Sequence, residues 1–186
     1  SSQSRGLGDV YKRQVIQFRG FDNNISHEDQ KLLQHRHENQ DWPGICEVTF
    51  KQPLGRGIVA TKVFQKHDVL VDYHGKDVFN TNYDEYMARE ENNGAKSEFI
   101  MCVNAPGRRL VDASSEVCQT KGHRQFRCQG RLVNHGKKTA NVIKKDVLLR
   151  INEKRHVVLV AKQKINPFEQ VSVSYTHLRA HETETN

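Results

Sequence analysis

The chain has 186 residues and a formal net charge of +7, with 29 lysines and arginines against 22 acidic residues. This length fits one domain, and no apolar run approaches the roughly 20 residues that a membrane-spanning helix needs. The four cysteines are widely spaced and form no CxxC pair, which is typical of reduced intracellular thiols and argues against a disulfide framework or a zinc ribbon. The positive charge favours anionic partners such as nucleic acid or nucleosomes, although charge does not define a fold.

Both ends of the sequence differ in character from the rest. Residues 1–14 and 175–186 follow no periodic pattern and resemble translated sequencing-adaptor reads, so we expect them to be non-native flanks. Between them, residues 15–45 are expected to form an N-terminal helical extension. Residues 46–174 are expected to form the main domain, truncated at its C-terminal end.

Residues 27–39 are predicted to form a short, mostly polar helix that begins after Ser26 as its N-cap. Two adjacent leucines are its only apolar anchors. His35 and His37 lie two residues apart and therefore point to different faces of the helix, so they cannot readily share a metal ion. We expect both on a solvated face.

From residue 46 onward the pattern changes to short segments rich in Val, Ile, Thr and aromatic residues, separated by turn residues. Such segments are typical of strands. They lie at residues 47–50, 57–64, 69–73, 99–103, 109–112, 142–151 and 155–161, with a last one around Val171 and Val173. A second short helix is predicted at residues 83–91. Many short strands with two small helices indicate a mostly β fold and argue against a doubly wound sheet.

Several short motifs carry the functional interpretation, and each alone is a common turn or strand end. In chain order they are Leu54-Gly55-Arg56-Gly57, Tyr73-His74-Gly75, Glu85-Tyr86-Met87-Ala88, Leu110-Val111-Asp112-Ala113, Gly130-Arg131-Leu132-Val133-Asn134-His135-Gly136 and Ile165-Asn166-Pro167-Phe168-Glu169-Gln170. Their order and spacing over about residues 48–175 resemble the SET-domain lysine methyltransferases. The resemblance is strongest to the branch that monomethylates the histone-four tail.

This resemblance implies a mostly β SET-domain fold, with small curved β-sheets around a threaded, pseudoknot-like C-terminal segment. It implies a protein-lysine N-methyltransferase that uses S-adenosylmethionine as its cofactor. The expected partner is a histone tail or another lysine-bearing protein, without a membrane partner. Localisation to the nucleus, with chromosomes, is also expected from the family.

The resemblance also assigns roles to particular residues. The expected cofactor contacts are Leu54, Gly55, Arg56, Gly57, Tyr86, Asn134 and His135. Glycines let the backbone approach a ligand closely, Arg56 can make charge-assisted contacts with the carboxylate of the cofactor, and Asn134 offers both a donor and an acceptor. The catalytic tyrosines map to Tyr175 and Tyr73, and the substrate channel maps to Phe99 and Val173.

Two other functions stay open at this point. A non-catalytic SET-like module that binds chromatin or another protein would explain Val173, which stands where the branch has a tyrosine. It would also explain why residues 98–101 lack the tyrosines of the usual channel strand. A plain basic nucleic-acid binder would explain the charge but not the ordered motifs.

Residues 114–129 form a longer and more basic segment than the resembling branch has between the same motifs. Its basic side chains are candidates for salt-dependent contacts with nucleosomal DNA phosphates. They are Lys121, Arg124 and Arg127. Cys118, His123 and Cys128 offer only three ligands, too few for a structural zinc site. We therefore predict a solvated loop and no metal site.

Overall fold

The computed structural model describes residues 15–18, 25–103, 109–118, 128–136 and 138–174. Two α-helices lie in these residues, α1 (His27–Asn39) and α2 (Tyr83–Glu90), with three short 3₁₀ helices, η2 (Glu91–Asn93), η3 (Ser97–Phe99) and η4 (Gln129–Leu132). The strands are β1 (Ile45–Thr49), β2 (Arg56–Ala60), β3 (Val69–Tyr73), β4 (Lys76–Phe79), β5 (Ile100–Val103), β6 (Arg109–Asp112), β7 (Asn134–His135), β8 (Val142–Leu149), β9 (Lys154–Ala161) and β10 (Gln170–Val173). Within this described part, no helix is long and apolar enough to cross a membrane.

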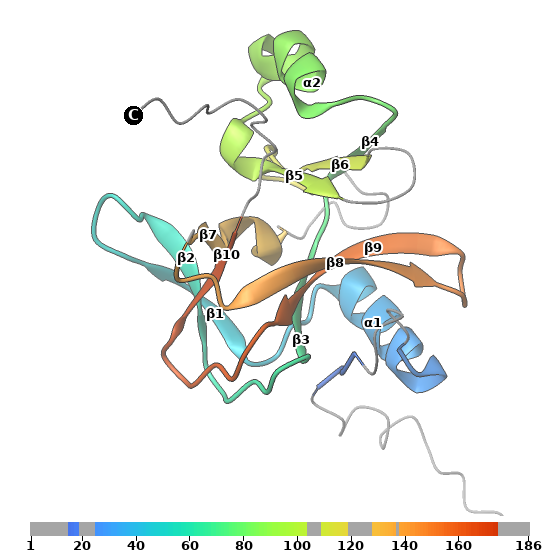
Figure 1. Ribbon diagram of the computed structural model, residues 1–186, viewed down its shortest axis with the longest axis vertical. Coiled ribbons are helices and arrows are strands. Elements are labelled where there is room, and N and C mark those ends of the chain that lie inside the picture. Colours follow the sequence, from blue (N-terminus) through green and yellow to red (C-terminus); the bar gives the residue numbers. More distant parts are fainter. Residues whose placement is uncertain (1–14, 19–24, 104–108, 119–127, 137, 175–186) are drawn as a thin grey trace, which may run out of the picture.

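The strands form two sheets. The larger sheet has the order β1-β2-β10-β8-β9-β3, with β7 added beside β10, and the smaller sheet has the order β4-β6-β5. The smaller sheet and α2 lie together at one end of the molecule, and the larger sheet lies at the other end with α1 beside it (Figure 1). The predicted mostly β architecture with two short helices is confirmed.

Strand β10 passes between segments that are distant in the sequence. It pairs antiparallel with β2 and parallel with both β7 and β8. The Asn141 side chain supports this crossing, because its Nδ2 donates to the Gln170 carbonyl at 2.8 Å and its Oδ1 accepts from the Ser172 amide at 2.9 Å. The amide group of one side chain thus satisfies backbone groups that a longer neighbouring strand would otherwise pair. This crossing is the threaded C-terminal segment that we expected.

Helix α1 has the predicted bounds, and the Ser26 hydroxyl accepts from the Asp29 amide at 3.0 Å. Leu32 and Leu33 are buried, so the two apolar anchors hold the helix against the core as predicted. The prediction of a solvated face is wrong for His37, whose Nδ1 lies 2.6 Å from Oδ2 of Asp72. The local sequence could not show this contact, because the partner lies on β3.

The main core is built mostly from aliphatic residues of the larger sheet, joined by residues of α1 and of the smaller sheet and by aromatic residues such as Trp42 and Phe64. All five residues of β3 are buried. A smaller cluster under α2 contains Tyr86, Ala95, Ile100 and Leu110. Cys118 and Cys128 are both buried, so the predicted solvated loop is wrong at these two residues, whereas residues 115–117 are exposed. Residues 119–127, which include His123 and the three basic residues Lys121, Arg124 and Arg127, lie outside the described residues.

Candidate functional site

A cavity of about 510 Å³ opens where three distant segments meet. The segments are the turn before β2, the η3 helix, and the stretch from η4 into β7. The lining residues are Pro53, Leu54, Arg56, Glu98, Phe99, Arg131, Leu132, Val133, Asn134 and His135. Five residues singled out from the sequence therefore lie around one space, although residues 54 and 135 are 81 positions apart.

The turn between β1 and β2 places the first wall of this cavity. The Phe50 amide donates to the Gly55 carbonyl at 2.7 Å, and Gly55 has a positive φ of 62°, a conformation that suits glycine. At Gly57, an added Cβ would lie 2.6 Å from Nδ2 of Asn134 and 2.6 Å from a ring carbon of Phe50. Gly57 therefore lets the Asn134 amide lie directly against β2.

The opposite wall carries a buried arginine to which the sequence analysis gave no role. Arg131 is 3% exposed, and its guanidinium carbon lies 4.0 Å from the centre of the Phe99 ring. Its Nη2 donates to the Ser114 carbonyl at 3.2 Å. Its Nε and Nη1 atoms are buried and make no hydrogen bond to any described residue. A buried cation whose hydrogen-bond donors lack acceptors lowers the stability of the fold, unless a ligand accepts those hydrogen bonds.

Glu116 links the two arginines of the cavity. Its Oε1 accepts from Nη2 of Arg56 at 2.8 Å and lies 3.4 Å from Nη1 of Arg131, which is close enough for an ion pair but is not a hydrogen bond. Glu116 is more than half exposed, so this carboxylate gives only modest stability. The pair of guanidinium groups is therefore available to a stronger anionic partner.

Asn134 presents a second unused donor. Its Nδ2 atom is buried and makes no hydrogen bond to the described residues. Strand β7 fixes its position, because Asn134 is paired with Ser172 and His135 with Val173 of β10. The cavity thus combines guanidinium and amide donors in the same wall, which suits a ligand with a carboxylate or other acceptor groups.

Tyr73, one of the two tyrosines predicted to be catalytic, is not among the residues that line this cavity. Tyr73 is 1% exposed, and its hydroxyl donates to the Phe99 carbonyl at 2.6 Å. Tyr73 therefore positions the Phe99 wall. Tyr175 lies outside the described residues. Val173 is buried in β10 and does not line the cavity, so its role and that of Tyr175 stay predictions.

Tyr86 belongs to a different place in the fold. It lines a separate cavity of about 310 Å³ beside α2, and its hydroxyl donates to Oδ2 of Asp112 at 2.7 Å. Burial, with this hydrogen bond, raises the pKa of the Tyr86 hydroxyl. The structure therefore does not bring Tyr86 together with Arg56 and Asn134, and its contact with a cofactor stays a prediction.

Comparison with solved structures defines the class of the fold. The chain is similar to the crystal structure of CpSET8 from Cryptosporidium, with a TM-score of 0.59 and 19% identity over 85% of this chain and 69% of that chain. It is also similar to the crystal structure of ATXR5 in complex with a histone, with a TM-score of 0.57 and 14% identity over 90% of this chain and 71% of that chain. These likenesses show a SET-type fold and confirm the predicted curved sheets around a threaded segment.

Comparison of sequences gives the family. The SET domain family matches residues 55–176, and the chain belongs to this family. Among curated proteins it is 31% identical to N-lysine methyltransferase KMT5A of Xenopus tropicalis, over 65% of this chain and 33% of that protein. It is 28% identical to histone-lysine N-methyltransferase Set8 of Drosophila pseudoobscura pseudoobscura, over 65% of this chain and 16% of that protein. The chain spans about a third or less of the length of these relatives.

Proposed function

We propose that this chain is a protein-lysine N-methyltransferase that uses S-adenosylmethionine. The supporting observation is the cavity between β2 and η4–β7, where Arg131 and Asn134 present buried donors that the described residues leave unused. Membership of the SET family supports the same reaction, as do the names of the related lysine methyltransferases.

The donors of the cavity fit the amino-acid end of this cofactor. Arg131 and Arg56 would hold its carboxylate through charge-assisted hydrogen bonds, and the Asn134 amide would donate to an acceptor beside it. The apolar wall formed by Phe99, Leu132 and Val133 would cover less polar parts of the ligand. When bound, S-adenosylmethionine supplies a methyl group on a positively charged sulfur.

The chain's own residues would then prepare the lysine amine. The reference pKa of lysine is about 10.4, so only about one amine in a thousand is neutral near pH 7.4. Apolar walls such as Phe99 and Leu132 would disfavour the charged ammonium and so lower the pKa of a lysine held against them. Tyr73 fixes the Phe99 backbone, and fixed alignment of the amine supplies much of the rate.

The first test is binding of S-adenosylmethionine by calorimetry to the wild-type chain and to Asn134→Ala. Loss of a donor to a charged group should weaken the affinity about tenfold to a hundredfold. The matched control is Asn92→Ala, because Asn92 is an exposed asparagine in η2 that does not line the cavity. Equal affinities in the two variants, or no binding by folded wild-type protein, would contradict the assignment of the cavity.

A second test distinguishes the roles of the two buried tyrosines, Tyr73 and Tyr86, in cofactor binding. Tyr73→Phe and Tyr86→Phe each remove one hydroxyl that donates a hydrogen bond, so each should lower the free energy of unfolding by about 1–2 kcal/mol in urea. Only Tyr73→Phe releases the Phe99 wall, so only this variant should weaken cofactor binding. Weaker binding by Tyr86→Phe would instead support the contact that the sequence resemblance assigned to Tyr86.

A non-catalytic SET-like module is the second candidate. In the described part of the chain no tyrosine lines the cavity, although a tyrosine hydroxyl near the transfer point belongs to the arrangement that the resemblance implies. Both candidates predict cofactor binding, so methyl transfer to nucleosomes separates them. Transfer from the preparation that binds cofactor supports the enzyme, and binding without transfer supports the module.

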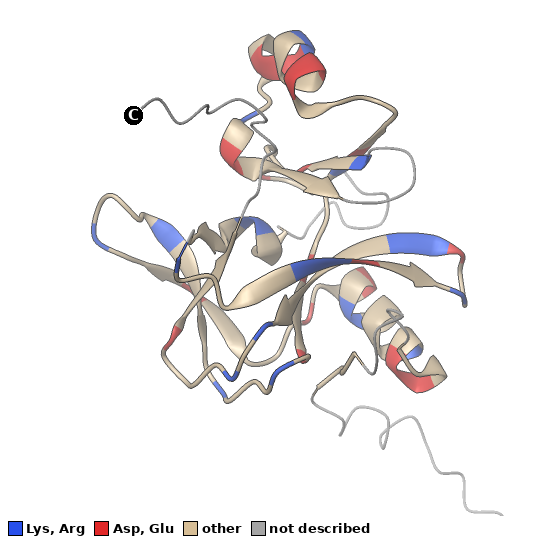
Figure 2. Cartoon of the chain, viewed as in Figure 1, with Lys and Arg blue, Asp and Glu red and all other residues tan. Residues whose placement is uncertain are grey.

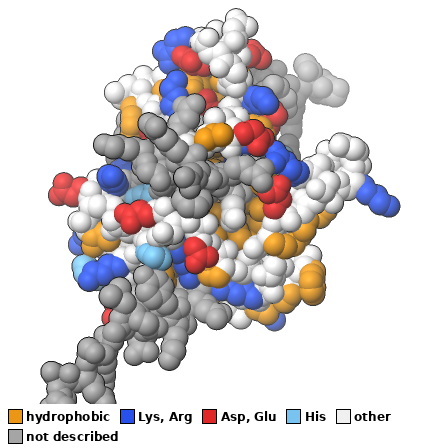
Figure 3. All heavy atoms as spheres, turned by 180° about the vertical axis from the view of Figure 1, so that it is seen from behind, with side chains coloured by type: hydrophobic (Ala, Val, Ile, Leu, Met, Phe, Trp, Pro, Cys, Tyr) orange, Lys and Arg blue, Asp and Glu red, His pale blue; other side chains and the backbone are white. Residues whose placement is uncertain are grey.

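A histone is the proposed substrate, and the nucleus the proposed location. The support is a relative named as a histone-lysine methyltransferase and a similar structure solved with a histone. The β8–β9 hairpin carries lysine and arginine positions (Figure 2). Two of these residues are engaged within the protein, because Lys144 donates to the Cys102 carbonyl and Arg155 to Asp146. On the opposite side of the molecule, acidic and apolar side chains are interspersed with the basic ones (Figure 3). Contacts of Lys121, Arg124 and Arg127 with DNA phosphates stay a proposal, and such contacts would be salt-dependent.

A further inference from the structure

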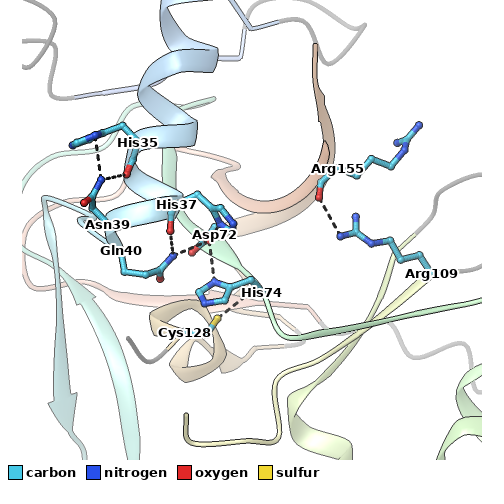
Figure 4. Close-up of polar contacts among 9 residues, drawn as sticks. All are labelled: His35, His37, Asn39, Gln40, Asp72, His74, Arg109, Cys128 and Arg155. Atoms are coloured by element: carbon cyan, nitrogen blue, oxygen red, sulfur yellow. Dashed lines mark hydrogen bonds and ion pairs between the residues drawn. The ribbon is translucent and has the colours of Figure 1, made fainter. Parts of the chain in front are cut away.

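Three side chains that do not line the cofactor cavity converge on one point between α1 and β3. Nδ1 of His37 lies 2.6 Å and Nδ1 of His74 lies 2.9 Å from the same oxygen, Oδ2 of Asp72. One ligand atom from each of the three residues lies within 4.8 Å of the other two. Figure 4 shows the two imidazole rings approaching Asp72 from different elements, His37 from the end of α1 and His74 from the end of β3.

The hydrogen bonds around Asp72 are unevenly distributed. Nε2 of Gln40 also donates to Oδ2, at 3.1 Å, so three donors share this oxygen. The other oxygen, Oδ1, is buried and makes no hydrogen bond to any described residue, and the residue is 1% exposed. An ordinary buried carboxylate would spread such donors over both oxygens.

A third histidine completes the surroundings. The His156 ring centre lies 4.3 Å from that of His37, and Nε2 of His156 is buried without a hydrogen bond to the described residues. Burial, reinforced by the charge of His37, lowers the pKa of His156 to about 3. The ring is therefore neutral at neutral pH. All four residues line one cavity of about 310 Å³, which leaves room for water beside them.

We propose that His37, Asp72 and His74 form a binding site for a divalent transition-metal ion, with Zn²⁺ as the best-fitting ion. Two imidazoles and a carboxylate are a ligand set that Zn²⁺ accepts, with a fourth position supplied from the adjacent cavity. His156 packs against His37 and orients that ring. The site fastens α1 to β3 and is separate from the cavity that holds Arg131 and Asn134.

The ligand atoms need only a small rearrangement to hold the ion. Tetrahedral Zn²⁺ with bonds of about 2.0–2.2 Å places its ligand atoms about 3.3 Å apart, against the 2.6 and 2.9 Å between the histidine nitrogens and Asp72. Asp72 is fixed in β3, and His37 lies on a helix that partly exposes it.

The test is titration of the tag-free, chelator-treated chain with Zn²⁺ by calorimetry and with Co²⁺ by visible absorption. Wild-type protein should bind one equivalent, show the spectrum of tetrahedral Co²⁺, and unfold at a higher temperature when Zn²⁺ is added. His37→Gln should weaken the affinity by about tenfold or more, since even loss of a residue that only orients a ligand costs this much. His35→Gln is the matched control, because its ring contacts Asn39 on the same helix.

Two results would overturn the proposal. The first is the absence of saturable binding of one equivalent by the folded wild-type chain, or equal affinities of His37→Gln and His35→Gln. The second is a thiolate-to-cobalt absorption band that disappears in Cys118→Ser or Cys128→Ser. Cys128 lies near the cluster, because the His74 amide donates to its Sγ at 3.3 Å. Such a band would mean that the ion is bound by a cysteine thiolate and not by the three proposed ligands. If Asp72→Asn also folds, its Zn²⁺ affinity should fall at least as much as that of His37→Gln.

Discussion

Replacement of Arg131 by methionine is expected to weaken S-adenosylmethionine binding by about tenfold to a hundredfold, because charge-assisted hydrogen bonds to the ligand are lost. The same change should alter the free energy of unfolding by no more than about 1 kcal/mol, because an apolar chain of similar size replaces a buried cation. The donors Nε and Nη1 of Arg131 make no hydrogen bond to the described protein. The methionine sulfur also keeps contact with the Phe99 ring. Calorimetry and urea denaturation of one preparation measure both quantities.

Arg109→Met is the matched control for this experiment. Arg109 is buried like Arg131, but its donors reach Asp77 at 2.8 Å, Asp146 at 2.9 Å and the Arg155 carbonyl at 3.2 Å. Its removal leaves Asp146 with one cationic partner fewer and should cost about 3–5 kcal/mol of stability, while folded protein keeps its cofactor affinity. The assignment fails if Arg131→Met lowers the free energy of unfolding as much as Arg109→Met does and leaves the cofactor affinity unchanged. Arg131 would then be a structural residue and not a ligand-binding one.

Elements whose stability is local could be predicted from the sequence. Helix α1 has the predicted bounds because its N-cap and its two leucines are local signals. Strand β3 also has the predicted bounds, since Val69–Tyr73 is rich in residues that favour a fully buried strand. The predicted strand at residues 57–64 is shorter in the structure and ends at Ala60, after which Phe64 forms only an isolated bridge with Ile165.

Elements that exist only through distant partners could not be found in this way. Strand β7 has two residues and is defined by its parallel pairing with β10, so no local periodicity indicates it. Strand β4 has a mostly exposed, charged pattern and is held by pairing with β6. The resemblance to a family, and not the strand pattern, predicted the threaded C-terminal segment in which β7 and β10 pair.

The candidate site shows the same division. The ordered motifs indicated Arg56, Gly57 and Asn134 as site residues. Arg56 and Asn134 line the cavity, and Gly57 lies against the Asn134 side chain. Arg131 stood in the same quoted motif, three positions before Asn134, and a cation directly before the apolar pair Leu132-Val133 was the signal that could have identified it. Nothing comparable marked His37, because a histidine on a polar helix is usually solvated and its partner Asp72 lies 35 residues away.

Replacement of Gly130 by alanine is expected to destabilise the fold strongly. Gly130 lies in η4, which packs against β3 and carries Arg131 and Leu132 into the cavity. A Cβ at this position would lie 2.1 Å from the Asp72 carbonyl oxygen and 3.3 Å from Cα of Tyr73. These obstacles are backbone atoms of a buried strand, so no side chain can turn away to make room. We expect a loss of about 3 kcal/mol or more, and a fall in melting temperature of roughly 6–12 °C for a chain of this size.

Gly94→Ala separates this clash from the general cost of losing a glycine. Gly94 has a φ of 92° and nothing within 4 Å of an added Cβ, so the change should cost only about 1–2 kcal/mol of backbone strain. Gly130→Ala should also weaken cofactor binding, because η4 must move and displace Arg131, whereas Gly94→Ala should not. Equal melting temperatures for the two variants would mean that η4 is not held against β3 at this distance. A Gly130→Ala protein that is destabilised but binds cofactor normally would mean that the position of Arg131 does not depend on that contact.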